Sequence, residues 1–288
     1  AERLSFASRI LRGTGLFLCG DLYHTLAPVI LKDDDGEVAF APLPYAEPGK
    51  VREALSADVH THEEAERVLS DFLLRQMGHA ARKVAIAHEF VAGGSASDSE
   101  RPLSIGGTDL ISADVFAPYN YTALGHLHGP QKAGGKENVR YSGSLLKYSF
   151  SEATQKKGVI VGEIDGAGQV KTTFISLSAR HDVRVIKGFF DDLIKGESED
   201  FLMAELLDEG PVIDAMARLR QKYPRMMTIQ SHRRMNSGSG ERSFDLMKKI
   251  DPLDMFRVFY KEFQDKEFTE EEEDYMKELW EDLRKEDD

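Results

Sequence analysis

The chain has 288 residues, 41% of them hydrophobic and 30% charged, so it is long enough for a sizeable core and more than one domain. It has no apolar run of about 18 residues and no signal-peptide pattern, and its single cysteine, Cys19, excludes an internal disulfide. We therefore expect a cytoplasmic protein without a membrane span. The net charge of −13 argues against a protein that simply coats DNA, but residues 251–288 contribute −10 of it, so the remainder could carry a basic face.

Residues 1–178 alternate short apolar strands with helices and turns, which is typical of an α/β fold. Strands are predicted at 16–19, 28–32, 37–43, 83–87, 121–124, 159–164 and 171–177, and a helix at 63–82. The turns DDDG at 33–36 and DG at 165–166 predict two hairpins. Residues 1–11 have helical spacing without a capping residue before them, so we expect the chain to be part of a longer protein.

The second half of the chain changes character. Residues 181–231 follow a β-α-β-α-β pattern, with helices at 189–194 and 212–223, that predicts a small second domain. A polar, Gly- and Ser-rich basic stretch at 232–242 predicts a linker, and two helices follow at 252–264 and 269–285, the second with a capping box at Thr269 and Glu272. We expect domains at 1–178 and 179–232, a linker at 233–250 and a helix pair at 251–288.

Three histidines stand at or just beyond the ends of predicted strands. His88 follows the strand at 83–87, and His126 and His128 form an H-x-H turn after the strand at 121–124. Neutral imidazole binds first-row transition metals, and strand ends are where α/β folds present their sites. A histidine at a strand end is, however, more often a hydrogen-bonded structural residue, and an H-x-H pair is common by chance. A two-metal phosphoesterase site also needs acidic ligands that these segments lack.

Several segments carry a resemblance to a known family. They are GHLHGPQ at 125–131, SASDSERPLSIGG at 95–107, VRYSGSLLKYSFSEATQKKG at 139–158, PLPYAEP at 42–48 and LLDEGPVIDAMARLRQKYP at 206–224. Together they resemble the SbcD family. Its members are the nuclease subunits of bacterial SbcCD complexes, and the family belongs to the calcineurin-like metallophosphoesterase superfamily. The resemblance runs through almost the whole chain. It implies part of a four-layer sandwich, a small α/β capping domain and a C-terminal helix pair.

The resemblance implies roles for the histidines. His88 matches the family's isolated metal-binding histidine, and His126 and His128 match its Gly-His-x-His motif, with one histidine for each ion of a manganese pair. The resemblance implies that the family's remaining ligands and its general acid, a histidine, come from a segment of about 80–100 residues directly before this chain. No catalytic residue is therefore expected within these 288 residues. Asp21 and His24 imitate one family motif but stand at the wrong place in the chain, so we interpret them as a turn.

The implied activity is hydrolysis of DNA phosphodiesters with two Mn²⁺ ions. The family acts as a double-strand exonuclease and a single-strand or hairpin endonuclease in DNA replication, recombination and repair. Partners would be double-stranded DNA ends and hairpins, a second copy of the chain in a homodimer, and the ATPase subunit SbcC. Arg233, Arg234 and Lys147 are weaker candidates for DNA contacts. Candidate SbcC contacts lie on the tail helices, at Phe256, Phe259, Phe263 and Trp280.

Two alternatives stay open at this point. The chain by itself could be a non-catalytic module that binds DNA and SbcC, with structural histidines. It could also be a different phosphoesterase, such as a nucleotidase or a protein phosphatase, although such enzymes need neither a cap nor docking helices.

Overall fold

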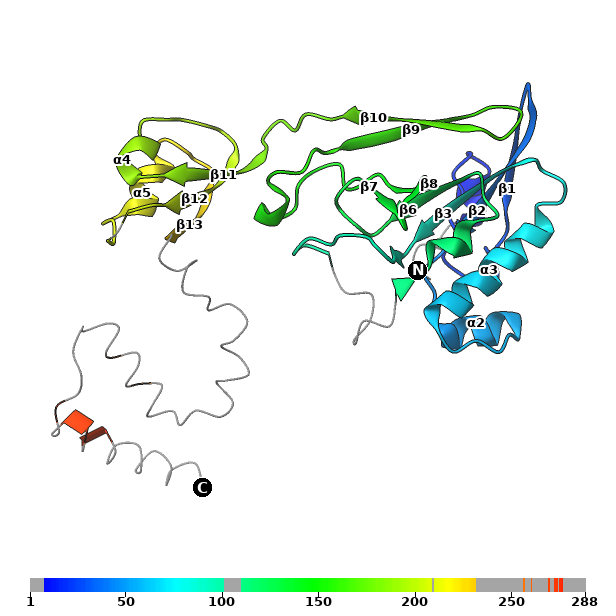
Figure 1. Ribbon diagram of the computed structural model, residues 1–288, viewed down its shortest axis with the longest axis horizontal. Helices are drawn as coiled ribbons and strands as arrows, with labels where there is room; N and C mark the ends of the chain where they lie inside the picture. The colour runs from blue at the N-terminus through cyan, green and yellow to red at the C-terminus, as the bar shows by residue number, and fades with distance from the viewer. Residues whose placement is uncertain are drawn as a thin grey trace.

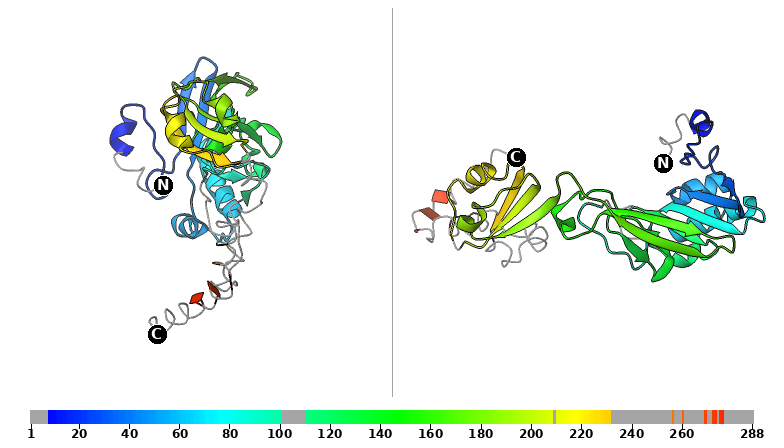
Figure 2. Two further views of the ribbon diagram at one scale, coloured as in Figure 1. Left: turned by 90° about the vertical axis from the view of Figure 1, so that its left-hand side faces the viewer. Right: turned by 90° about the horizontal axis from the view of Figure 1, so that it is seen from above.

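The computed structural model describes residues 8–100, 110–208 and 210–231, together with Phe256, Tyr260, Thr269, Glu272, Glu273, Tyr275 and Met276. These residues form two lobes at opposite ends of an elongated molecule, with the β9–β10 hairpin extending between them (Figures 1 and 2). The first lobe contains residues up to 176, and the second contains residues 182–231. Each lobe has its own hydrophobic core.

The elements of the first lobe are α1 (Ser8–Arg12), β1 (Val29–Asp33), β2 (Gly36–Leu43), α2 (Pro48–Leu55), α3 (His62–Gln76), β3 (Arg82–His88), β4 (Phe90–Val91), β5 (Leu110–Ile111), η2 (Ala113–Phe116), β6 (Tyr121–Gly125), β7 (Gln131–Ala133), β8 (Lys136–Tyr141), η3 (Phe150–Glu152), β9 (Gly158–Ile164) and β10 (Val170–Ser176). The second lobe contains β11 (Val183–Gly188), α4 (Phe190–Leu193), β12 (Phe201–Leu206), α5 (Ala215–Arg220) and β13 (Met226–Ser231).

A six-stranded sheet organises the first lobe, in the order β1-β2-β3-β6-β8-β7. The four central strands are parallel, and the outer strands β1 and β7 pair antiparallel with their neighbours. Helix α3 packs against β2 and buries Leu69 and Leu73, over the sheet face that includes Ala41 and Ala85. Thr61 and Glu64 form a capping box at the start of α3.

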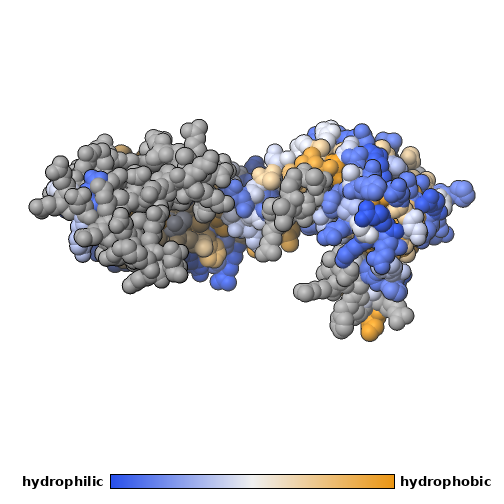
Figure 3. All heavy atoms as spheres, turned by 90° about the horizontal axis from the view of Figure 1, so that it is seen from below, coloured by the Kyte–Doolittle hydropathy of each residue, from blue (hydrophilic) through white to orange (hydrophobic). Residues whose placement is uncertain are grey.

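The opposite face of this sheet is open at its centre. Ile86, in the middle of β3, is 51% exposed, whereas the strands of parallel sheets are usually covered on both faces. Ile86 lies in a groove of about 750 Å³ whose lining also includes Phe17, Pro42 and His88. Figure 3 shows that the coloured surface of the first lobe, seen from below, is mostly hydrophilic with small apolar patches.

Both predicted hairpins are present. Strands β1 and β2 pair directly across the turn at 33–36, and β9 and β10 pair along seven residues each. Buried Arg82 reinforces the first hairpin, because its guanidinium donates hydrogen bonds of 2.8 and 2.5 Å to the carboxylate of Asp33. The strands predicted around 83–87 and 121–124 are also confirmed, as β3 and β6.

Two predictions about the first lobe are wrong. Residues 16–19 are not a strand; this apolar run is irregular, and Cys19 packs against the core through its side chain. Helix α3 ends at Gln76 and not at 82, because the chain turns at Gly78, whose φ of +58° favours glycine, and Arg82 already belongs to β3. The short strands β4, β5 and β7 were not predicted, since two or three residues carry too little periodicity.

The second lobe has the predicted β-α-β-α-β order. Strands β11, β12 and β13 form a parallel sheet, whose core contains Leu202, Ala204 and Leu219. Both helices are shorter than predicted, and α5 starts only after Asp214, which has a left-handed φ of +52°. The mixed α/β architecture of the two lobes agrees with the predicted class, while the complete four-layer sandwich stays a prediction.

Little of the tail belongs to the described residues. The predicted capping box is confirmed, because Thr269 Oγ1 accepts from the Glu272 backbone N–H at 3.3 Å and the Glu272 carboxylate accepts from the Thr269 backbone N–H at 2.9 Å. Most of the predicted helix pair, and the linker at 233–250, lie outside the described residues. None of the helices in the described part of the chain has the length and apolar character needed to cross a bilayer.

A buried acid on α3 generates a pH-dependent prediction. Glu66 is buried, Oε1 of its side chain has no hydrogen-bond partner within the described residues, and burial raises the pKa of its carboxyl to about 8. Between the ordinary value of 4.5 and 8, the folded chain keeps a proton that the unfolded chain has lost. Stability should therefore fall as the pH rises through this window, by up to about 1.4 kcal/mol per pH unit.

Glu66→Gln cannot ionise, so its stability should stay flat over this window and exceed that of the wild type at pH 8. Urea unfolding at pH 5, 6.5 and 8 measures this difference. Asp71→Asn, on the exposed side of α3, controls for the loss of an acid from this helix. A wild-type stability that does not fall between pH 5 and 8 would contradict the assignment.

Candidate functional site

His88 and His126 are brought together by the parallel pairing of β3 with β6. His88 ends β3 opposite Gly125, the last residue of β6, and His126 follows directly. The centroids of the two imidazole rings are 5.4 Å apart, at an interplanar angle of 71°. Burial lowers the pKa of His88, which favours its neutral form. The two histidines therefore meet at the carboxyl ends of adjacent parallel strands, as predicted.

Two backbone features make this approach possible. A Cβ on Gly125 would stand 2.9 Å from Nδ1 of His88, so only glycine fits without moving the ring. His126 has a φ of +108°, which is unusual for a residue with a side chain. Such backbone conformations cost about 1–3 kcal/mol and concentrate at functional sites. The backbone conformation of Gly125 and His126 therefore allows the two rings to lie side by side.

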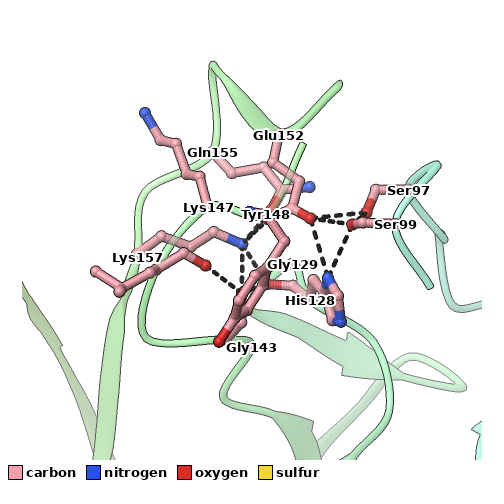
Figure 4. Close-up of polar contacts among 12 residues, drawn as sticks. Ser97, Ser99, His128, Gly129, Gly143, Lys147, Tyr148, Glu152, Gln155 and Lys157 are labelled. Carbon is pink, nitrogen blue, oxygen red and sulfur yellow. Dashed lines mark hydrogen bonds and ion pairs between the residues drawn. The ribbon is translucent and has the colours of Figure 1, made fainter. Parts of the chain in front are cut away.

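His128 belongs to a separate polar network, drawn in Figure 4. Its Nδ1 lies 2.9 Å from Oε1 of Glu152 and 2.9 Å from Oγ of Ser99. Its backbone N–H donates to Glu100 at 2.6 Å. Within the described residues, no hydrogen bond reaches Nε2 of His128. The ring is thus held at one nitrogen, and the other nitrogen is left for a ligand or substrate.

Glu152 and Lys157 form a buried ion pair behind His128. Oε2 of Glu152 lies 2.6 Å from Nζ of Lys157, and the two side chains are 0% and 5% exposed. The Lys157 ammonium also donates to the backbone carbonyl of His128 at 2.7 Å and to Ser144 at 2.9 Å. Burial alone would raise the pKa of Glu152, but hydrogen bonds from Lys157, Ser99 and His128 outweigh it and lower the pKa to about 2. Glu152 is therefore ionised at neutral pH.

The trio of Ser99, His128 and Glu152 is not a nucleophilic triad. In such a triad the serine and the acid occupy opposite nitrogens of the imidazole. Here Ser99 and Glu152 both face Nδ1, and Ser99 also donates to Glu152. The serine is thus a further donor to the carboxylate, and His128 has no route for taking its proton with Nε2.

The three histidines could provide some, but not all, of the ligands that a first-row transition metal needs. Their donor chemistry is suitable, and the His88–His126 pair approaches closely enough to share an ion. Among the described residues, however, no group of three or more His, Cys, Asp or Glu side chains lies close enough to hold a metal ion. A complete site would need further ligands, including carboxylates.

The other sequence candidates have different surroundings. The Lys147 side chain is 9% exposed, and its ammonium donates to Asp182 at 2.9 Å and to the Val183 carbonyl at 3.2 Å. It thereby joins the first lobe to the start of β11, a structural role that the sequence did not indicate, and contact with DNA stays a prediction. Arg233 and Arg234 lie outside the described residues.

The turn at Asp21 and His24 is a local structure. The exposed ring of His24 has its Nδ1 2.6 Å from the Asp21 carboxylate, which also accepts from the backbone N–H of Tyr23. Thr25 closes the turn by donating to the Asp21 carbonyl. These contacts agree with the interpretation of this segment as a turn.

In the tail, Phe256 is helical and 39% exposed. The other three predicted partner contacts, Phe259, Phe263 and Trp280, lie outside the described residues.

Residues missed by the sequence analysis include Ser99, Glu152 and Lys157. Each belongs to a segment that carries the resemblance to the SbcD family, but an isolated acid, serine or lysine gives no signal of its own. The spacing of Glu152 and Lys157 around the start of β9 becomes meaningful only once both face His128.

A comparison with known families shows what the second lobe is similar to. Residues 179–263 match the family model SbcD_C, described as the type 5 capsule protein repressor C-terminal domain. This part of the chain is similar to SbcD C-terminal domains. The match starts at the residue where the second domain was expected, and it includes the whole second lobe and all but the last residue of the first predicted tail helix. Because all three histidines precede it, the SbcD-like relationship rests on a region separate from the candidate site.

The close packing at Gly125 generates a stability prediction. Gly125→Ala should destabilise the chain by about 1–3 kcal/mol, because the new methyl group overlaps the His88 ring. Urea unfolding measures the change. Gly162→Ala, in strand β9, is the matched control, since its Cβ would meet nothing within 4 Å. If the two variants are equally stable, β6 and His88 are farther apart than described.

Proposed function

We propose that this SbcD-like chain is the nuclease subunit of an SbcCD-type complex, which hydrolyses DNA phosphodiesters. One observation carries the proposal: a single chain combines the SbcD_C match at 179–263 with histidines at the ends of adjacent parallel strands. Open α/β sheets bind their ligands at this edge. Double-strand exonuclease activity and endonuclease activity on single strands and hairpins, in replication, recombination and repair, belong to the same proposal.

His88, His126 and His128 would hold the metal ions through ring nitrogens. A pair of Mn²⁺ ions at this edge would polarise the scissile phosphate and supply hydroxide at neutral pH. The strand pairing of β3 with β6 orients the first two rings, and the Glu152 network orients the third. A histidine outside this chain would serve as the general acid that protonates the leaving oxygen.

We also propose that a segment preceding Ala1 in the full-length protein supplies the acidic ligands. The open sheet face around Ile86 supports this idea, because its groove is apolar and leads to His88 at the candidate site. A further layer on this face would cover the groove and bring carboxylates beside the histidines. An upstream coding region without Asp-x-His and Asn-His-Asp motifs would contradict the proposal.

The partner of the tail would be the SbcC-type ATPase subunit. The SbcD_C match extends to residue 263, so it includes Phe256, Phe259 and Phe263. An exposed aromatic such as Phe256 suits an apolar contact with a partner helix. Two copies of the complete subunit would act together on double-stranded DNA ends.

A second candidate concerns these 288 residues by themselves. Because the described residues hold no cluster of three metal-binding side chains, the chain alone would be a catalytically incomplete module that binds DNA and SbcC. The SbcD_C match argues against the nucleotidase and protein phosphatase alternatives. Mn²⁺-dependent cleavage by the isolated chain would rule out the incomplete module.

Substitution of the histidines tests the nuclease proposal in the full-length protein. His126→Ala and His128→Ala should each lower Mn²⁺-dependent cleavage of hairpin DNA by at least about 100-fold, since a direct ligand contributes no less than an outer-shell residue. His24→Ala is the control and should keep most of the activity, because the contacts of His24 within the described part of the chain are with Asp21 and Tyr23 of its own turn. An active His128 variant and an inactive His24 variant would reverse the assignment.

Deletion of residues 251–288 tests the partner proposal. The truncated full-length protein should lose its association with SbcC in a pull-down, because the apolar helix faces are removed, yet it should bind Mn²⁺ with unchanged affinity. Phe256→Ala should weaken the association with a smaller change in length and charge. Undiminished SbcC binding by the truncated protein would place the docking surface elsewhere.

A further inference from the structure

The buried carboxylate of Glu152 has polar partners around both of its oxygens. Its Oε1 lies 2.9 Å from Nδ1 of His128 and accepts from the hydroxyl of Ser99, and its Oε2 accepts from Lys157 at 2.6 Å. The backbone N–H of Tyr148 also approaches Oε2, at 3.3 Å. The acid is therefore fully surrounded by donors, and one of them is the ring of a candidate ligand (Figure 4).

This arrangement determines where the imidazole proton resides. An ionised carboxylate can only accept hydrogen bonds, so Nδ1 of His128 must donate. In the neutral ring the lone pair then belongs to Nε2, the nitrogen that metal ions and protons can use. A carboxylate on one ring nitrogen is also the common outer partner of histidine ligands in metal sites.

Lys157 fixes the position of Glu152 relative to His128. Its ammonium contacts the carboxylate of Glu152 and the backbone carbonyl of His128, so one buried cation holds both the acid and the residue that the acid orients. Gln155 and Ser144 lie 2.8 and 2.9 Å from the same nitrogen and share its third N–H. Because a buried ammonium needs this full set of partners, the loop from 142 to 157 is tied to the turn that carries His128.

We propose that Glu152 is a positioning residue that fixes His128 as the Nδ1–H tautomer and presents Nε2 to the metal site, with Lys157 holding Glu152 in place. The use of Nε2 as a metal ligand rests on the proposed function. The tautomer and the ring orientation do not, because they follow from the contacts of Glu152 alone. The two parts can therefore fail separately.

The test uses the full-length protein in two measurements. Nitrogen NMR of ¹⁵N-labelled histidine, without metal, reports which ring nitrogen of His128 carries the proton. Mn²⁺ titration followed by electron paramagnetic resonance reports metal affinity. The wild type should show the Nδ1–H tautomer. Glu152→Gln should shift His128 toward the Nε2–H tautomer, because an amide can donate to Nδ1, and should weaken Mn²⁺ binding by about 10–100-fold.

Glu152→Gln leaves the Lys157 ammonium buried without a counter-ion, and an unpaired buried charge destabilises the fold. The double variant Glu152→Gln with Lys157→Met removes both charges and should show the same change of tautomer and affinity. Glu205→Gln, which removes the acid of the partly buried Lys187–Glu205 pair in the second lobe, is the matched control and should change neither measurement. Circular dichroism confirms that each variant is folded.

The outcomes separate the two parts of the proposal. A His128 tautomer that is Nε2–H in the wild type, or that is unchanged in both Glu152 variants, would overturn the positioning role. A shifted tautomer with undiminished Mn²⁺ affinity would overturn the metal role of Nε2, and with it this part of the proposed function, while the positioning role would stand. A shift in both measurements supports both parts.

Discussion

The parallel pairing of β3 with β6 is the constraint on which the candidate site depends. It sets His88 opposite Gly125, and the absence of a Cβ at Gly125 lets the His88 ring occupy the space beside β6. His126 then meets that ring from the following turn. Because side chains alternate along a strand, a shift of the register by one residue would turn His88 to the other face of the sheet. The buried face under α3 prevents that shift, since it would expose Ala85 and Ala87 and bury Ile86.

The loop between β8 and β9 connects this site with the rest of the molecule. On one side, Glu152 and Lys157 hold the ring and the backbone of His128. On the other side, Lys147 from the same loop binds Asp182 at the start of the second lobe. The loop therefore contacts the candidate site and the SbcD-like lobe at once. The orientation of His128 and the attachment of the second lobe depend on neighbouring ion pairs.

Most of the fold could be predicted from local patterns. The turn DDDG and the apolar runs on both sides of it predict the β1–β2 hairpin, and the strands that carry His88 and precede His126 are short apolar runs ending at polar residues. The apolar run at 16–19 was misleading, because a loop that packs Cys19 on a core has the same composition as a short buried strand. Elements of two or three residues, such as β4 and β7, are determined by tertiary pairing and leave no periodic signal.

Only the histidines of the candidate site could be picked out from the sequence. Histidines at strand ends have a recognisable pattern, but the partners of His128 come from segments 29 residues before it and 24 residues after it. Nothing in the sequence near Glu152 distinguishes it from a surface acid, and the ion pair of Lys147 with Asp182 has no signal in the sequence around either residue. Long-range ion pairs of this kind depend on the relative placement of elements, which a single sequence does not reveal.

The central claim is that the edge of the sheet at His88, His126 and His128 holds metal in the full-length protein. Anomalous X-ray scattering at the manganese edge, from crystals of that protein grown with Mn²⁺, tests it most directly. We predict anomalous peaks for manganese ions at coordination distance from the ring nitrogens of these histidines, with His128 coordinating through Nε2. Peaks at other residues, or His128 coordinating through Nδ1 with Glu152 turned away, would contradict it.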